Sequence, residues 1–115
     1  MSNRDKRWIK LALKIAENSN HVQHKMSAIV VRGGNVVAKG FNVVKSPHTD
    51  NKPNHAEARA LRNKGDFRGC TIYIVRNNGK MSKPCPHCMA RIKEAQISRM
   101  VYLDWNGDLQ REYVL

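Results

Sequence analysis

The chain has 115 residues, which is enough for one domain with one hydrophobic core and too few for two. Hydrophobic residues make up 41%, yet no stretch approaches the roughly 18 apolar residues that span a membrane, and the N-terminus lacks the apolar block of a signal peptide. These features exclude a membrane-spanning protein, and we expect one soluble, cytoplasmic domain over residues 1–115.

Positive charge is the second strong feature of the composition. There are 21 Lys and Arg against 9 Asp and Glu, so the formal net charge is +12. Such an excess on a small domain attracts nucleic acid, nucleotides or anionic surfaces, unless it only makes the surface soluble.

Apolar residues near the N-terminus follow the period of a helix. Trp8, Leu11, Ala12 and Ile15 are spaced as one face of a helix over about residues 5–17. Its lysines lie elsewhere on the helix. This pattern predicts a helix that packs on the core and exposes a basic side, rather than a membrane helix.

Two apolar runs then flank the dipeptide Gly33-Gly34, which favours a tight turn. The runs cover residues 27–32 and 36–41 and are rich in β-branched side chains, so they predict a hairpin. Residues 43–53 follow as a long loop.

Helices and strands alternate in the second half of the chain. The expected elements are a helix over 55–64, a strand over 71–76, a helix from Pro86 to about Gln96, and strands over 100–103 and 109–114 joined by an Asn106-Gly107 hairpin. This order predicts an α/β fold: a single-domain, three-layer α-β-α arrangement with a mixed five-stranded sheet and a C-terminal β-hairpin. We expect strands joined through helices to be parallel neighbours.

Two short clusters carry the chemistry: His55-Ala56-Glu57, and Pro84-Cys85-Pro86-His87-Cys88. Both begin at predicted helix starts, where partial positive charge lowers the pKa of a thiol. One imidazole and two thiolates are ligands that favour zinc. Because a structural zinc normally has four protein ligands, three of them indicate a catalytic zinc with one open position.

Each cluster alone has a simpler interpretation. A lone C-x-x-C is also a redox pair, and Glu57 follows Asn54 at the spacing of a helix cap. His87 is a poor candidate for a fourth ligand, because its backbone position would direct its side chain away from the ion if both flanking thiols bind. Cys70, which stands alone, fits a small buried hydrophobe. Together, however, H-x-E and P-C-x-x-C are the signature of zinc-dependent nucleobase deaminases.

At this point the chain resembles the cytidine and deoxycytidylate deaminase superfamily over nearly its whole length. His-Ala-Glu at 55–57 is the form typical of deoxycytidylate deaminases and tRNA adenosine deaminases. Free-cytidine deaminases usually carry cysteine in place of that histidine. Gly40-Phe41-Asn42 is similar to the Gly-aromatic-Asn at the end of their second strand, whereas the C-terminal hairpin looks more like free-cytidine deaminases.

The resemblance implies one zinc ion per chain, held by His55, Cys85 and Cys88, with Glu57 moving protons while cytosine becomes uracil and ammonia leaves. It also implies that Asn42 and the main chain of Ala56 hold the base. Two further residues are candidates for substrate binding from their positions alone. They are His48, in the loop before the site, and Trp105, an exposed aromatic at the predicted hairpin tip.

Three hypotheses for the substrate remain open. The first is a cytosine nucleotide such as dCMP, or a nucleoside, which the His-Ala-Glu form, the Asn42 match and the small size support. The second is a base within single-stranded DNA or RNA, which the net charge favours. The third is a nucleic-acid-binding module with a structural zinc, against which the missing fourth ligand and Glu57 count. We expect no membrane partner, and we expect a homo-oligomer, as is common among the relatives.

Overall fold

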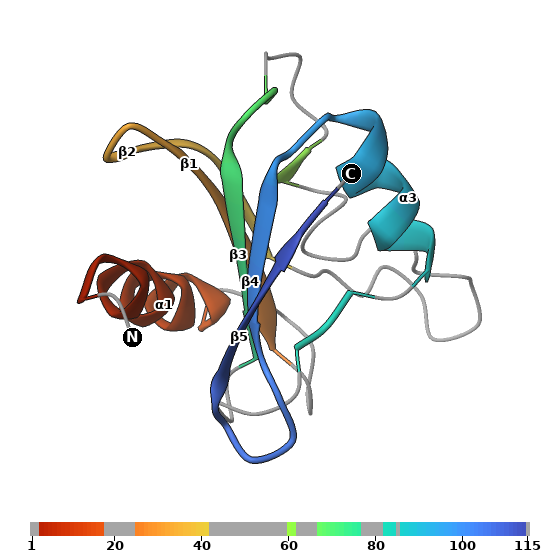
Figure 1. The fold of residues 1–115 in the computed structure, drawn as a ribbon. Helices are drawn as coiled ribbons and strands as arrows, with labels where there is room; N and C mark the ends of the chain where they lie inside the picture. Colours follow the sequence, from red (N-terminus) through yellow and green to blue (C-terminus); the bar gives the residue numbers. More distant parts are fainter. Residues whose placement is uncertain are drawn as a thin grey trace.

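The computed structural model describes residues 3–17, 25–41, 60–61, 67–76, 82–84 and 86–114. The elements within them are, in chain order, α1 (Asn3–Ala16), β1 (Met26–Arg32), β2 (Asn35–Phe41), β3 (Thr71–Arg76), α3 (Pro86–Glu94), β4 (Arg99–Leu103) and β5 (Leu109–Tyr113). The strands form one sheet, with α1 against one face and α3 on the other (Figure 1). The three-layer α-β-α fold with a mixed five-stranded sheet is thus confirmed. No described helix is long and apolar enough to cross a membrane.

The strand order in the sheet is β2-β1-β3-β4-β5. β1 pairs antiparallel with both β2 and β3, β3 pairs parallel with β4, and β4 pairs antiparallel with β5. Both predicted hairpins are therefore confirmed. The expectation that strands joined through helices are neighbours holds for β3 and β4 but is wrong for β2 and β3, because β1 lies between them.

The tight turn between β1 and β2 explains this arrangement. Gly33 and Gly34 have positive φ angles of 54° and 84°, which glycine adopts without strain. They fold β2 back against one edge of β1 and leave the other edge of β1 for β3. Because β1 is antiparallel to both partners, β2 and β3 run in the same direction. The carboxyl ends of β2, β3 and β4 consequently lie at one edge of the sheet.

Alternate residues of the central strands belong to two separate cores. On the α1 side, Ile29, Tyr73 and Val101 pack with Trp8, Ile9 and Ala12 of the helix. On the α3 side, Val30, Ile72, Ile74 and Met100 pack with Ile92 and Cys70. Burial of β3 on both faces and the buried position of Cys70 confirm two predictions. Ala60 and Leu61, from the predicted helix over 55–64, also pack on the α3-side core, and the rest of that helix lies outside the described residues.

The first helix begins at Asn3, slightly earlier than predicted, and its buried side is shifted from the predicted face. Trp8 and Ala12 are buried as expected, but Ile9 and Ala16 are buried as well, while Leu11 and Ile15 are only partly so. The buried hydroxyl of Ser27 donates to the carbonyl of Ala12, which ties β1 directly to the helix.

A buried carboxylate in α1 was not predicted. Asp5 is 1% exposed and accepts a 2.6 Å hydrogen bond from the hydroxyl of Tyr73. Its oxygens lie 3.0 Å from Arg99 Nη2 and 2.9 Å from Arg111 Nε. Burial by itself would raise the pKa of Asp5, but the hydrogen bonds from Tyr73 and Arg99 and the charges of Arg99 and Arg111 outweigh burial, so this pKa is lowered. This ion-pair network joins α1 to β3, β4 and β5.

Candidate active site

The candidate site lies where the carboxyl ends of three strands meet. β2 ends at Phe41, β3 at Arg76 and β4 at Leu103, and α3 begins at Pro86 in the segment that follows β3. In open α/β sheets, ligands bind outside the carboxyl ends of the strands. Asn42, predicted to hold the base, directly follows the last residue of β2 but lies outside the described residues.

Ser82 fixes the segment that leads into α3. Direct pairing between β3 and β4 runs from Thr71↔Arg99 to Tyr73↔Val101. Beyond it, the Ser82 N–H donates to the carbonyl of Leu103 at 2.9 Å, and its hydroxyl donates to the carbonyl of Ile74 at 2.7 Å. The same hydroxyl accepts the N–H of Leu103 at 2.9 Å. Ser82 therefore bridges the two strands where their own ladder has ended.

Sequence reasoning missed this role of Ser82. The residue stands in a polar stretch before Pro84-Cys85 and reads as ordinary loop. The structure shows it 1% exposed. A single serine in a loop gives no periodic signal, so only its position between two strands identifies it.

Lys83 adds a second attachment next to Ser82. Its amine lies 5.8 Å from the centre of the Tyr102 ring and 3.6 Å from Oε1 of Glu112. Burial, followed by the negative charge of Glu112, raises the pKa of Tyr102. Pro84 is buried. Ser82 and Lys83 are thus held by contacts with β3, β4 and β5.

Cys88 is the predicted zinc ligand that the structure describes. It is 0% exposed and lies in the first turn of α3, and that helix begins at Pro86 as predicted. Partial positive charge at a helix N-terminus favours the thiolate form of such a cysteine. A buried thiol in this position fits the donor set expected for zinc.

The other predicted site residues lie outside the described residues. They are His55, Ala56, Glu57, Cys85, Asn42 and His48. Within the described segments, no three His, Cys, Asp or Glu side chains form a group that could hold a metal. Convergence of His55 and Cys85 with Cys88 therefore stays a prediction.

Trp105 lies at the tip of the β4–β5 hairpin, as expected, and is 70% exposed. The turn is closed by Asp104, whose Oδ1 accepts the N–H groups of Asn106 and Asp108, each at 2.9 Å. The hydrogen bond from the Asp108 N–H is the main cause of a lowered pKa of Asp104, and the other hydrogen bonds to its carboxylate lower this pKa further. Because the turn follows the end of β4, Trp105 extends from the same sheet edge as the candidate site.

Comparison with known proteins gives a family and a relative of similar sequence. The family model described as "Cytidine and deoxycytidylate deaminase zinc-binding region" matches residues 2–104. A tRNA-specific adenosine deaminase from Buchnera aphidicola is 33% identical over 119 residues, which cover 96% of this chain and 72% of that protein.

Two solved structures share the fold. The dCMP deaminase from the cyanophage S-TIM5 is similar with a TM-score of 0.70 and 26% identity, over 93% of this chain and 89% of that one. A cytidine deaminase from Burkholderia pseudomallei gives a TM-score of 0.73 over 99% of this chain and 94% of that one. The latter is 22% identical, so it supports the fold alone.

Proposed function

From the premise that the chain belongs to the cytidine and deoxycytidylate deaminase zinc-binding region family, we propose that it removes the exocyclic amino group of cytosine in a nucleotide such as dCMP, or in a nucleoside. Water is consumed, uracil is formed and ammonia leaves. The observation that carries this proposal is the likeness to the cyanophage dCMP deaminase, which extends over 93% of this chain and 89% of that one.

The proposed metal ligands are His55, Cys85 and Cys88, which would hold one zinc ion. When bound, zinc supplies hydroxide near neutral pH, because it lowers the pKa of its water to roughly 7. The part of the chain that the structure describes supports the site through Cys88, a buried thiol at the start of α3. Ser82 supports it by fixing the segment just before Cys85.

Glu57 is the proposed proton carrier. It takes a proton from the attacking water and delivers it to ring nitrogen N3. It then takes the proton of the hydroxyl group added at C4 and delivers it to the amino group, which leaves C4 as ammonia. Asn42 and the main chain of Ala56 are proposed to hold the base, and His48 to line the substrate pocket or contact a phosphate.

A second candidate is deamination of a base within single-stranded DNA or RNA. Two observations favour it. The tRNA-specific adenosine deaminase from Buchnera aphidicola is 33% identical to this chain, and the formal net charge of this chain is +12. A polyanionic substrate gains affinity from such a charge, whereas one nucleotide uses little of it.

One panel of substrates tests the proposal. The zinc-loaded protein is incubated with dCMP, cytidine, a single-stranded oligonucleotide that contains cytosine, and an RNA stem-loop that contains an unpaired adenosine. Ammonia release and the identity of the product base are measured. We expect dCMP to be deaminated with the highest kcat/KM. Turnover confined to the oligonucleotide or to the RNA would contradict the nucleotide as substrate and support the second candidate.

A further inference from the structure

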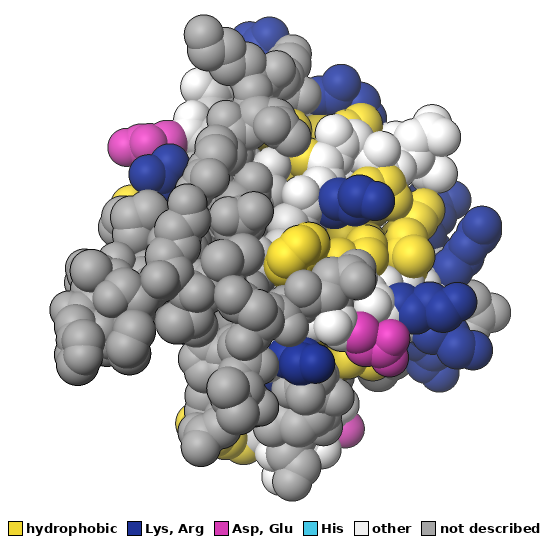
Figure 2. Space-filling view, turned by 180° about the vertical axis from the view of Figure 1, so that it is seen from behind, with side chains coloured by type: hydrophobic (Ala, Val, Ile, Leu, Met, Phe, Trp, Pro, Cys, Tyr) yellow, Lys and Arg dark blue, Asp and Glu magenta, His cyan; other side chains and the backbone are white. Residues whose placement is uncertain are grey.

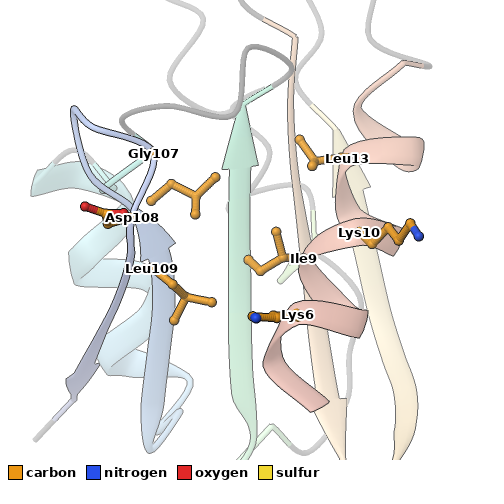
Figure 3. A pocket seen from close by; sticks show the side chains of 8 residues that line it. Lys6, Ile9, Lys10, Leu13, Gly107, Asp108 and Leu109 are labelled. Atoms are coloured by element: carbon orange, nitrogen blue, oxygen red, sulfur yellow. The ribbon is translucent and has the colours of Figure 1, made fainter. Parts of the chain in front are cut away.

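A groove of 260 Å³ separates α1 from the C-terminal hairpin (Figure 3). Its floor is apolar and comes from Ile9 and Leu13 of the helix and from Leu103 and Leu109 of β4 and β5. Lys6 and Lys10 line the helix side, and Asp108 lines the hairpin side. In Figure 3 the amine of Lys10 points away from the hairpin, so its stem borders the groove and its charge faces outward.

The exposed side of α1 carries only positive charge over the length of the helix. Its exposed cations are Arg4, Lys6, Arg7, Lys10 and Lys14. The one carboxylate of the helix, Asp5, is buried and paired with Arg99 and Arg111, so it does not offset the exposed charges. Figure 2 shows Lys and Arg side chains gathered on the right, the side where α1 lies after the half turn from Figure 1.

An exposed indole lies in the hairpin turn that borders the groove. Trp105 is 70% exposed and lies in the same turn as Gly107 and Asp108, which line the groove. An exposed aromatic side chain together with a basic surface is the combination with which proteins bind single-stranded nucleic acids, whose bases stack on the aromatic ring. The hydrogen bonds of Asp104 hold the turn, so Trp105 is presented by a closed hairpin.

We propose that this groove, together with Trp105, is a binding surface for single-stranded nucleic acid. Phosphates lie along the exposed side of α1, and unpaired bases stack on Trp105 and contact the apolar floor. A duplex fits less well, because its base faces are already stacked. A membrane surface fits less well, because the apolar side of α1 is packed on the sheet.

The hairpin tip connects this surface to the candidate active site. The turn follows the carboxyl end of β4, at the sheet edge where β2 and β3 also end. A strand bound in the groove thus runs toward that edge. This last step rests on the proposed deaminase site, whereas binding in the groove does not depend on it.

Fluorescence anisotropy with a labelled oligothymidylate of about 20 nucleotides tests the binding. Thymine has no exocyclic amino group, so the readout is independent of deamination. We expect Trp105→Ala to weaken binding at least fivefold, since stacking on one aromatic contributes about 1–3 kcal/mol. For Lys6→Gln with Lys10→Gln, we expect the slope of log K against log salt to fall by about 1.4, or about 0.7 per phosphate contact.

Lys93→Gln is the matched control, because Lys93 is an exposed lysine on α3, at the opposite face of the sheet. It should leave the affinity nearly unchanged. Thermal unfolding of each variant checks that the fold is intact, as expected for changes at exposed positions.

Three results would overturn the proposal. The first is a loss in log K for Lys93→Gln that is about half the loss for the α1 pair, as expected for one charge against two, which would mean that only total charge matters. The second is duplex binding as tight as that of the single strand and insensitive to Trp105. The third is a change of oligomeric state in the groove variants with unchanged oligothymidylate affinity, which would assign the groove to a second copy of the chain.

Discussion

Ser82 and Leu103 are joined by two hydrogen bonds, each 2.9 Å long, one through the main chain of Ser82 and one through its hydroxyl. The same hydroxyl donates to Ile74 on the neighbouring strand. These hydrogen bonds fix Ser82, which precedes Pro84, between β3 and β4. The segment that leads into α3 is therefore attached to the sheet by a serine three positions before Cys85.

Ser82→Ala should weaken zinc retention as well as stability. The change leaves the Ile74 carbonyl and the Leu103 N–H buried without their side-chain partner, which costs about 1–3 kcal/mol in unfolding free energy. It also removes two of the three hydrogen bonds that attach the segment leading to the thiols. Competition with a chromogenic chelator measures zinc affinity, and urea unfolding measures stability.

A conservative variant and a control variant test whether the hydroxyl of Ser82 is the cause. Ser82→Thr keeps the hydroxyl and should restore most of the zinc affinity. Ser98→Ala is the control, because the Ser98 hydroxyl bonds to the carbonyls of Gly69 and Cys70 near the opposite ends of the strands. Loss of stability in Ser82→Ala with wild-type zinc affinity would show that Ser82 supports the fold only.

Cys88→Ser should abolish stoichiometric zinc binding, whereas Cys70→Ser should not. Both thiols are buried, but Cys70 packs in the core near the start of β3 and Cys88 lies in the first turn of α3. Because the two changes bury the same hydroxyl, their difference isolates metal binding. Zinc per chain is measured by elemental analysis after gel filtration. An equal zinc content in both variants would remove Cys88 from the ligand set.

Glu57→Gln should keep zinc and lose roughly a hundredfold to ten-thousandfold in kcat, the usual contribution of a positioned acid–base group. The amide has nearly the same shape as the carboxylate but cannot carry the proton. Zinc content and single-turnover deamination of the best substrate are measured on the same sample. Turnover within a factor of two of the parent would assign the proton transfer to another group.

Asp5→Asn should cost on the order of 3 kcal/mol in unfolding free energy, because it leaves Arg99 and Arg111 without their buried anion. In the parent protein the folded-state pKa of Asp5 lies below its ordinary value of 3.8. Its contribution to stability is therefore present above that value and is lost as the pH falls through the folded-state pKa.

The pH dependence of unfolding checks this second effect. Urea unfolding between about pH 2 and 7 should show a steeper loss of stability on acidification in the parent than in Asp5→Asn. Asp108→Asn, at an exposed position on the hairpin, is the control and should change stability by about 0.5 kcal/mol at most. Parallel pH curves for the parent and Asp5→Asn would mean that the carboxylate titrates normally.

The sequence by itself determined the local elements and the chemistry. β-branched runs marked the strands, Gly33-Gly34 and Asn106-Gly107 marked the two hairpins, and Pro86 marked the start of α3. Each of these signals depends on neighbours a few residues away, which is why it can be read without the fold. The two motifs indicated the family for the same reason, because each is a short run of residues with a specific spacing.

Only the tertiary structure decided which strands pair and which distant side chains contact one another. β1 lies between β2 and β3 because the hairpin turn pairs β2 with only one of its two edges. The hydrophobic pattern of the sequence does not predict which strand pairs with the other edge. Asp5 meets Arg99 across 94 positions of the chain, and Ser82 fills a gap between two strands. Contacts of this kind arise when distant segments pack together and buried polar groups must find partners, so they follow from the assembled sheet and not from any local pattern.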